Sequence, residues 1–427
     1  MKVGIGILGG GTVGGALLQY LINEQAAIVA KTGLELEVRR VAVRSLSKTR
    51  AFPIPVEIIT DRPEQLIDDP SIDLVVELMG GLEPAGDLVM RALQAGKPVV
   101  TANKELVAAR GAELIQRAEE KGVSLLFEAA VGGGIPIIRP LSESLAGERI
   151  TRVLGIVNGT TNYILTRMSE DDLGFDEAVE EAQALGYAEA DPTADVSGAD
   201  AAAKTAILAS LAFGTWVSVD AVYREGIESI EPIDLRFAAT LGYIPKLLAI
   251  GVETPTGVSA RVHPALVPLD HPLASVRGAN NAVFIEGPQV GQLLFMGPGA
   301  GGGPTATAVL GDIIDAAREL LAHAQVAPRI RFAPGRLRDF GEIETKWYVR
   351  LEVADAPGVL ALVAGTFGEF GVSIKSVWQE GRGEDATLLL ITHDALEANQ
   401  RAAVAALRSL DVVTEVAATI RVQSDEP

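Results

Sequence analysis

The stretch VGIGILGGGTVG, residues 3–14, decides the fold of the N-terminal part of this chain. An apolar strand over Val3–Leu8 runs into a turn with the spacing G-x-G-x-x-G, and a helical pattern follows directly. In such a unit Gly9 permits a tight turn, Gly11 lets a pyrophosphate approach the backbone, and Gly14 lets the helix pack close to the strand. Amide groups at the helix start then bind phosphate charge, so the stretch predicts a dinucleotide site.

Strand and helix patterns alternate over the first 130 residues, which predicts a parallel sheet with helices on both faces. Right-handed crossovers make this a doubly wound, Rossmann-type α/β domain. We expect the domain to span residues 1–136 and to be completed by about 305–330. Its further strands are expected at Val38–Val43, Leu74–Leu78, Pro98–Val100 and Ser124–Glu128, and its helices at Val13–Asn23, Glu105–Lys121 and Thr307–Ala324.

From about Ile137 the sequence changes to long helical patterns interleaved with β-rich pieces. This texture predicts a mixed α/β domain at residues 137–304, to which we assign substrate binding, catalysis and dimerisation. The helical patterns are Phe175–Leu185 and Ala199–Phe213, and the β-rich pieces are Ile150–Val157, Ala282–Glu286 and Gln292–Met296.

After a loop-like boundary near Arg331–Ile343, the last part of the chain follows the order βαββαβ. That order is typical of a small ferredoxin-like unit, which we place at residues 345–427. The expected elements are a strand at Trp347–Val353, a helix at Val359–Glu369, strands at Ser373–Gln379 and Ala386–Thr392, a helix at Leu396–Leu407 and a strand at Glu415–Val422.

The composition narrows the class of protein. The 427 residues carry a net charge of −20, which argues against nucleic acid or an anionic membrane as a partner. The chain has no cysteine, which excludes disulfides and thiolate chemistry, and its four histidines lie at spacings unlike those of a zinc site. No apolar run approaches the roughly 20 residues that span a bilayer, and no export signal is visible, so we expect a cytoplasmic protein.

The residues after the second strand predict which cofactor is bound. An NAD site usually places an acidic residue there to hold the ribose hydroxyls. Here Val38–Val43 is followed by Arg44, with Lys48 and Arg50 close behind. A cationic cluster at this place suits the extra phosphate of NADP, so we expect NADP, with NAD as the alternative cofactor. A solvated basic turn without a ligand is the other interpretation.

Lys104 is a candidate for contact with the cofactor or the substrate. It ends the segment Thr101-Ala102-Asn103-Lys104, which follows the expected strand Pro98–Val100. Ligands bind at the carboxyl ends of strands in open α/β sheets, so the segment lies where a ligand is expected. A surface lysine at a helix start is the alternative.

The segment Gly186–Lys204 carries four acidic residues ahead of its terminal lysine. Asp200 and Lys204 are four residues apart and therefore share one face of a helix that is otherwise rich in Ala, Ile and Leu. Lys204 is then either an edge residue whose stem covers apolar surface or a desolvated acid/base group held beside carboxylates.

Taken in order, several motifs of residues 1–325 resemble homoserine dehydrogenase, in its monofunctional form. They are Gly9–Gly14, Thr101–Lys104, Glu128–Pro136, the NGTTNY stretch Asn158–Tyr163, Gly186–Lys204, His271–Ala274 and Gly297–Ala306, of which Gly186–Lys204 is the most specific. One departure is Gly10 between the two motif glycines, where extra flexibility would weaken the grip on the cofactor slightly.

The resemblance implies interconversion of L-homoserine and L-aspartate 4-semialdehyde with NAD(P), and it implies a role for each matching residue. Lys204 would be the catalytic acid/base. Glu189 and Asp200 would bind the substrate's amino group, and Asp195 would support the lysine. The other implied substrate contacts are Thr160, Tyr187 and Lys104, and the implied cofactor contacts are Gly9, Gly11, Thr12, Val13, Gly14, Arg44, Lys104, Gly186 and Gly301.

The resemblance also implies a sodium site in the glycine-rich segment after residue 127. Glu128 would supply an oxygen, together with the main-chain carbonyls of Val131, Gly133 and Ile135. Such an ion would be structural rather than catalytic. A glycine-rich hinge between domains is the alternative, and the two interpretations are compatible.

The C-terminal part resembles an ACT domain, a module that binds amino acids. The resemblance rests on Asp355–Leu360, on Phe370–Ile374 and on the βαββαβ order. It implies feedback inhibition by L-threonine and a homodimer or homotetramer. A dimerisation module without a ligand is the alternative.

Two rival functions remain open at this point. Another dehydrogenase for amino-acid-like carbonyls, such as aspartate dehydrogenase, would share the nucleotide fold but lack the set Glu189, Asp200 and Lys204. A regulatory protein that only senses nucleotides and amino acids would have no need of a lysine on an apolar helix.

Overall fold

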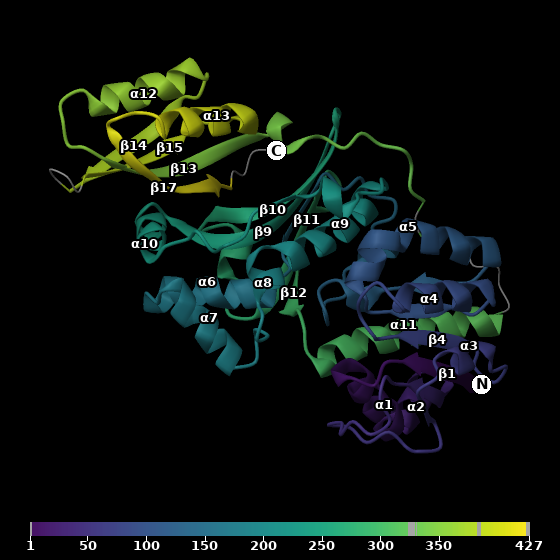
Figure 1. Cartoon of the computed structure of the whole chain (residues 1–427). Helices are drawn as coiled ribbons and strands as arrows, with labels where there is room; N and C mark the ends of the chain where they lie inside the picture. Colours follow the sequence, from purple (N-terminus) through teal and green to yellow (C-terminus); the bar gives the residue numbers. More distant parts are fainter. Residues whose placement is uncertain (1, 323–328, 330, 382–385, 424–427) are drawn as a thin grey trace. The chain divides into compact units, whose positions relative to one another are not determined.

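The glycine turn follows strand β1 of a six-stranded sheet. The strand order is β3-β2-β1-β4-β5-β6, and every neighbouring pair is parallel. Two right-handed halves that meet between β1 and β4 produce this order, which confirms the doubly wound prediction. The strands are β1 Lys2–Leu8, β2 Glu35–Ala42, β3 Ile59–Thr60, β4 Leu74–Glu77, β5 Val99–Thr101 and β6 Leu125–Leu126. The helices around them are α1 Thr12–Asn23, α2 Gln25–Thr32, α3 Glu64–Asp68, α4 Ala85–Gln94, α5 Lys104–Lys121 and α11 Gly302–Ala322 (Figure 1).

The structure, a computed structural model, describes residues 2–322, 329, 331–381 and 386–423. The chain forms two compact units, each assembled from separated segments. The first unit comprises Met1–Thr151, Ala206–Val219 and Asn281–Pro334, and the second comprises Arg152–Thr205, Asp220–Asn280 and Gly335–Pro427. Among the described residues, no helix is both long enough and apolar enough to cross a membrane.

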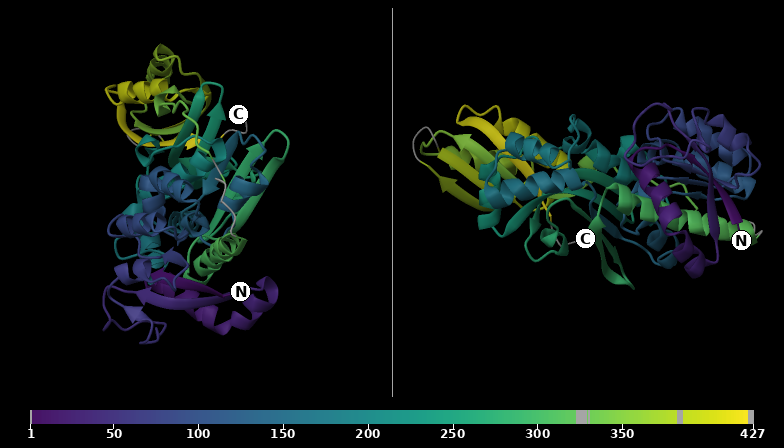
Figure 2. Two further views of the ribbon diagram at one scale, coloured as in Figure 1. Left: turned by 90° about the vertical axis from the view of Figure 1, so that its right-hand side faces the viewer. Right: turned by 90° about the horizontal axis from the view of Figure 1, so that it is seen from below.

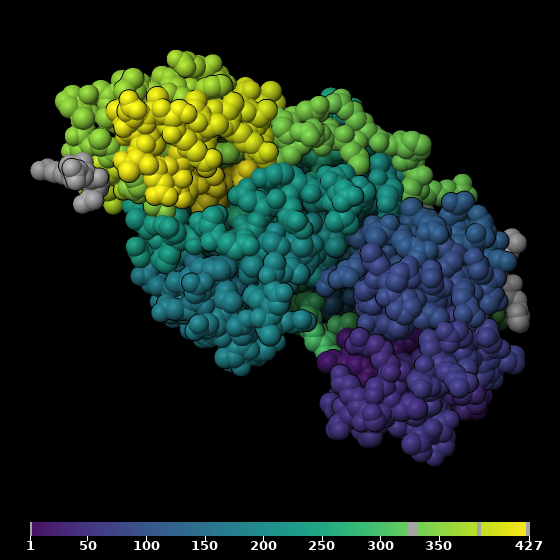
Figure 3. All heavy atoms as spheres, viewed as in Figure 1, coloured from purple at the N-terminus to yellow at the C-terminus, as the bar shows by residue number. Residues whose placement is uncertain are grey.

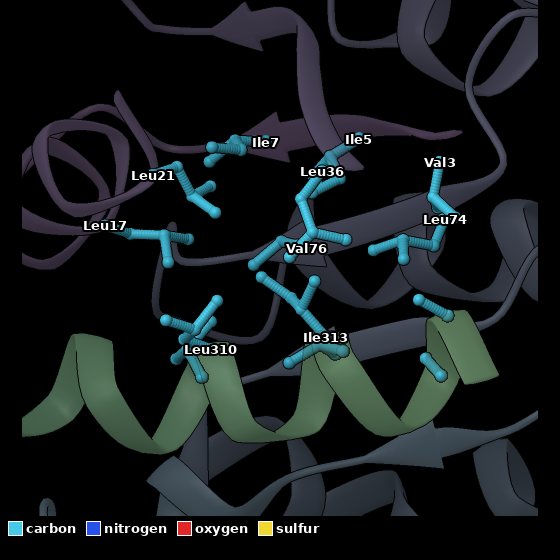
Figure 4. Packing of buried hydrophobic residues seen from close by; sticks show 14 of the residues in the cluster. Val3, Ile5, Ile7, Leu17, Leu21, Leu36, Leu74, Val76, Leu310 and Ile313 are labelled. Atoms are coloured by element: carbon cyan, nitrogen blue, oxygen red, sulfur yellow. The ribbon is translucent and has the colours of Figure 1, made fainter. Parts of the chain in front are cut away.

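Helix α11 completes the core of the first unit although it is distant from the sheet in sequence. Strand β1 is buried from Val3 onward, as expected for a parallel strand that is covered on both faces. Figure 4 shows Leu310 and Ile313 of α11 directed at Leu17 of α1 and at Val76 of β4, all four buried. Each such buried side chain contributes roughly 1.5–3 kcal/mol. Residues 323–328 and 330, at the end of the expected 305–330 segment, lie outside the described residues.

The expected strand Ser124–Glu128 is shorter than predicted. Strand β6 ends at Leu126, and Glu128–Ala130 form a 3-10 helix instead. The Glu128 carboxylate is buried and accepts hydrogen bonds from three later backbone amides, which bends the chain back on itself. The two remaining strands of this unit, β11 Asn280–Gly287 and β12 Gly291–Pro298, pair with each other.

The second unit contains a mixed sheet of order β7-β9-β10-β17-β13-β15-β14. Its strands are β7 Arg152–Ile156, β9 Tyr243–Thr254, β10 Gly257–Pro268, β13 Glu344–Val353, β14 Ile374–Glu380, β15 Ala386–Thr392 and β17 Val413–Val422, with the two-residue strands β8 Tyr223–Arg224 and β16 Ala395–Leu396 beside it. Its helices are α6 Gly159–Asp171, α7 Phe175–Ala184, α8 Thr193–Val196, the start of α9 Ala199–Phe213, α10 Pro232–Thr240, α12 Val359–Glu369 and α13 Glu397–Leu407.

The C-terminal part has the predicted βαββαβ order, with strands arranged β17-β13-β15-β14. Helices α12 and α13 cover one face of these strands (Figures 1 and 2). Side chains alternate along β13, so Trp347 and Val349 pack under the helices, whereas Tyr348 faces Ala238 of α10 and Leu266 of β10.

The C-terminal part therefore shares a sheet and a core with residues 220–280, rather than standing apart. Strand β17 pairs with β10 through Ala265 opposite Arg421, and the two segments adjoin in the space-filling view (Figure 3). The C-terminal part belongs to the same compact unit as residues 152–205 and 220–280, whereas residues 281–304 belong to the first unit. The division into functional domains at 1–136, 137–304 and 345–427 stays a prediction.

Candidate active site

The glycine turn has the backbone geometry that its spacing predicts. Gly9 adopts φ 114°, a conformation that favours glycine, and its amide donates to the carbonyl of Ala42 at 2.9 Å. A Cβ on Gly14 would lie 2.1 Å from the carbonyl oxygen of Gly9, so helix and turn approach too closely for a side chain. A Cβ on Gly11 would meet no atom within 4 Å, which leaves room for a ligand at the start of α1.

The neighbouring residues of the turn also have defined places. Thr12 and Val13 begin α1 and are exposed and half-buried, respectively. Gly10 has a packing role, because a Cβ there would lie 2.8 Å from Ile54 and 2.9 Å from Val43. The absence of a side chain at Gly10 thus lets the segment after β2 close over the turn.

The cationic cluster follows β2, as the sequence predicts. Arg44 and Lys48 are exposed. The guanidinium of Arg50 donates to the carbonyl of Lys48 at 2.9 Å and also to the carbonyl of Ser45, so Arg50 holds the loop together. Arg44 is therefore better placed than Arg50 to meet a ligand phosphate.

Lys204 is held in a polar cluster of the second unit. Its Nζ donates to the carbonyl oxygen of Val157 and to Oδ2 of Asp200, both at 2.7 Å. The Lys204 side chain is 11% exposed and that of Asp200 6%, so this ion pair is largely withdrawn from water. The structure thus favours a desolvated lysine beside a carboxylate over a lysine that merely covers apolar surface.

Asn158 joins the two carboxylates of the cluster, a role that the sequence reasoning missed. Its Nδ2 donates to Asp195 at 2.6 Å and to Asp200 at 2.8 Å. Its Oδ1 accepts from the amide of Thr161 at 2.8 Å and so caps α6. That cap orients the amide nitrogen toward the acids. The available signal was an asparagine between strand β7 and a helix start, which sequence alone explains as a cap.

Asp195 and Asp200 form a paired acidic site around that amide. Burial raises the pKa of Asp195 above its ordinary value; the hydrogen bond from Asn158 opposes the rise, and the charge of Asp200 adds to it. Two carboxylates with one lysine leave an excess of negative charge, which suits a substrate ammonium group.

Thr160 and Tyr187 are also brought together, by α6. Thr160 Oγ1 donates to the carbonyl oxygen of Tyr187 at 2.7 Å, and the Tyr187 ring packs on that of Tyr163 with centroids 4.8 Å apart. Gly186 directly precedes Tyr187 and has φ 77°, a conformation that supports the turn out of α7. This arrangement fixes the segment that leads to Asp195.

Glu189 belongs to the second unit, whereas Lys104 and Gly301 belong to the first. The Glu189 side chain is exposed, and its carbonyl accepts from Gln183 Nε2 at 3.1 Å. Lys104 belongs to the first unit and begins α5, directly after Asn103, whose side chain caps that helix. Gly301 precedes α11 in the first unit and has φ 114°.

The carboxylate of Glu128 accepts hydrogen bonds from three backbone amides. Its oxygens accept from the amides of Ile137, Ile138 and Arg139 at 2.6–2.8 Å, and its own amide donates to Asp312 at 2.8 Å. The described residues contain no group of three or more His, Cys, Asp or Glu side chains placed to hold a metal ion. A cation here would therefore take most of its ligands from main-chain oxygens.

The residues after Glu128 form a tight, mostly buried turn. Gly132 and Gly133 have φ values of 74° and 57°, and a Cβ on Gly133 would lie 2.3 Å from the carbonyl oxygen of Gly299. Val131 and Ile135 on either side are buried. Hard cations accept main-chain carbonyl oxygens as ligands.

Two sequence models match the chain in succession. The model described as "Homoserine dehydrogenase, NAD binding domain" matches residues 9–128, and the model described as "Homoserine dehydrogenase" matches residues 136–314. Together they contain the glycine turn and the Lys204 cluster.

Curated relatives match along nearly the whole chain. The homoserine dehydrogenase of Mycobacterium tuberculosis is 48% identical over 99% of this chain and 98% of its own, and that of Corynebacterium glutamicum is 46% identical over 99% and 96%. Such full-length matches favour this family over the aspartate dehydrogenase-like and sensor alternatives.

Solved structures of the same family also match the chain. A homoserine dehydrogenase from Thiobacillus denitrificans has a TM-score of 0.95 at 43% identity, covering 99% of both chains. A hyperthermophilic archaeal homoserine dehydrogenase in complex with NADPH has a TM-score of 0.64 at 32% identity, covering 75% of this chain and 98% of its own. The chain belongs to the homoserine dehydrogenase family of NAD(P)-dependent oxidoreductases, which act in amino-acid biosynthesis from aspartate.

Proposed function

We propose that the chain interconverts L-homoserine and L-aspartate 4-semialdehyde with NADP(H) and that Lys204 is its acid/base. The contacts of Lys204 Nζ carry this proposal. A charged lysine has three N–H donors, and Val157 and Asp200 engage two of them, which leaves one for the substrate oxygen. The bound cofactor supplies or accepts the hydride. Lys204 gives its proton to the carbonyl oxygen during reduction and takes the hydroxyl proton during oxidation.

The same cluster supports a binding site for the substrate's amino group. Asp200, with Asp195 beside it, offers buried negative charge that is aligned by Asn158. We assign Thr160 and Tyr187 to the wall of the pocket, because their mutual hydrogen bond shapes the segment that leads to the acids. Glu189 and Lys104 are proposed as further contacts, Glu189 from its exposed loop.

Lys204→Ala is expected to lower kcat by a factor of about 10² or more, because the proton donor is removed from the transition state. The dissociation constant of NADPH should stay unchanged, since the glycine turn belongs to the other unit. Absorbance assays at the NADPH band and fluorescence titration of NADPH measure the two quantities. Lys375→Ala, an exposed lysine of β14, is the matched control. Near-normal turnover of the Lys204 variant would refute its role.

We assign Arg44 to the 2′-phosphate of NADP, beside the glycine turn formed by Gly9, Gly11 and Gly14. The exposed guanidinium directly after β2 supports this assignment, and the archaeal relative was solved with NADPH. Thr12, Val13, Lys104, Gly186 and Gly301 are proposed as further cofactor contacts.

Arg44→Ala is expected to raise KM for NADPH by about 10-fold while KM for NADH changes little, because only NADPH carries the phosphate that the guanidinium binds; about 1.4 kcal/mol of charge-assisted bonding corresponds to that factor. Steady-state kinetics with both cofactors test this. Arg62→Ala, at another exposed arginine of the same unit, should leave both KM values unchanged. An equal rise in KM for NADPH and for NADH would show that Arg44 does not bind the phosphate.

A structural sodium ion is proposed at the turn after Glu128, bound by an oxygen of Glu128 and by the main-chain carbonyls of Val131, Gly133 and Ile135. The glycine conformations and the burial of the turn support it.

Replacing NaCl by KCl or choline chloride at constant ionic strength is therefore expected to lower the thermal unfolding midpoint, because the native state loses a bound ion. The initial rate with saturating substrates at low temperature should stay the same, since the ion takes no part in the reaction. Scanning calorimetry and NADPH absorbance measure the two effects. Identical unfolding midpoints in the three salts would remove the sodium site.

The C-terminal part, residues 345–427, is proposed as an ACT-like module that binds L-threonine and contributes to a homodimer or homotetramer. The βαββαβ arrangement supports this, as does edge strand β14, where Val377 and Trp378 are 36% and 39% exposed. The archaeal relative covers only 75% of this chain, so about a quarter of the chain has no counterpart there.

L-threonine is expected to lower turnover of the full chain, whereas D-threonine should not, because a folded site distinguishes the two configurations. Inhibition assays and isothermal titration calorimetry measure this, and sedimentation velocity on the same samples reports the assembly. A chain that binds no L-threonine and sediments as a monomer would contradict both parts of the proposal.

A further inference from the structure

Arg421 of strand β17 connects the C-terminal part of the chain to the loop after β8. Its guanidinium forms an ion pair with Glu225, and Nη2 also donates to Glu397 of α13 at 2.6 Å. The Arg421 side chain is 5% exposed and that of Glu397 is fully buried. One arginine therefore holds a carboxylate of α13 and a carboxylate of the middle segment at the same time.

Aromatic rings keep this arginine and its partner in place. The Arg421 guanidinium lies 4.8 Å from the centre of the Trp347 ring. The Tyr223 hydroxyl donates to Glu225 at 2.9 Å, and its ring stacks on Phe340 at 4.0 Å between centroids. Contacts of this kind hold a planar guanidinium in one orientation.

Glu397 keeps its charge in this buried place. Burial pushes the pKa of Glu397 upward, but the charge and hydrogen bond of Arg421, with hydrogen bonds from Thr345 and Trp347, hold it below the ordinary value. Arg421 therefore meets two carboxylates, and its orientation toward Glu225 is fixed by a neighbour that stays ionised.

Glu225 begins a short segment that packs against the residues next to the catalytic cluster. The amide of Ile227 donates to the carbonyl of Val196 at 2.9 Å. A Cβ on Gly226 would lie 2.3 Å from that same carbonyl and 2.8 Å from Cα of Ser197, so the two backbones touch without intervening side chains. Val196 adjoins Asp195, one of the two acids that Asn158 holds.

We infer that Glu225 is a positioning residue for the reaction. Arg421 holds Glu225 in place, and through this contact the C-terminal part helps to set the geometry of Asp195 and Asp200 around Lys204. This inference rests on the proposed function of Lys204. Each step rests on a hydrogen bond: from Arg421 to Glu225, from the amide of Ile227 to the carbonyl of Val196, and from Asn158 to the two acids. A displacement of the Glu225 loop moves the backbone that carries Asp195.

Glu225→Gln tests this, because it keeps the size of the side chain and removes its charge. We expect kcat/KM for homoserine to fall by about 10-fold or more, since small misplacements of acid/base groups are costly. The pH profile of kcat/KM should also be displaced, while KM for NADP is unchanged. Glu342→Gln is the matched control, because Glu342 also pairs with an arginine of this unit but is exposed and outside the chain of contacts. It should behave as the wild type.

Arg421→Lys separates positioning from folding, because lysine keeps the charge but not the fork that reaches both carboxylates. It should lower kcat/KM on its own, and combining it with Glu225→Gln should cause no further loss, since the two residues act as one unit. Thermal unfolding of each variant checks that the native state persists.

Two results overturn the inference. In the first, folded Glu225→Gln keeps the wild-type kcat/KM and pH profile; in the second, the losses of the two variants simply add. If the wild type turns over homoserine in the same assay, either result removes this inference alone. An inert wild type would instead overturn the proposed function, and this inference with it.

Discussion

The side-chain amide of Asn158 is the contact on which the arrangement of Asp195, Asp200 and Lys204 depends. One end caps α6, and the other end holds Asp195 and Asp200 side by side, so the start of a helix fixes two like charges close together. Without a donor between them, two neighbouring carboxylates would repel each other. Lys204 completes the group from one turn further along the helix that carries Asp200. The cluster is therefore assembled from the starts of α6 and α9 and from the short helix α8 between them.

Local pattern was sufficient for much of this structure. The alternation of strands and helices and the G-x-G-x-x-G turn predicted the parallel sheet, because both features are written within about thirty residues of sequence. The pairing of Asp200 with Lys204 was predictable in the same way, since i and i+4 share a helix face. Gly9 and Gly14 have the close backbone approaches that their motif requires.

The features that the sequence could not predict are contacts between residues far apart in the chain. Asn158 looks like an ordinary cap until Asp195, 37 residues later, is folded back onto it. The three amide partners of the Glu128 carboxylate lie nine to eleven residues later and meet it only when the chain has turned. The pairing of β17 with β10 is likewise invisible, because a ferredoxin-like unit with its own core predicts an independent domain. Register between distant strands has no local signature.

A buried ion pair also connects the C-terminal part to α10. Asp234 of α10 is fully buried, and its carboxylate is held by Arg350 at 2.8 Å and by the hydroxyl of Tyr348 at 3.0 Å, both from β13. Removing one partner of a buried ion pair costs roughly 3–5 kcal/mol, a large share of the stability of a domain. Asp234 of α10 thus depends on the C-terminal strands for the partners of its buried carboxylate. The C-terminal part is a structural component of its unit, and any ligand that shifts β13 or β17 acts on a surface already coupled to α10 and to the Glu225 loop.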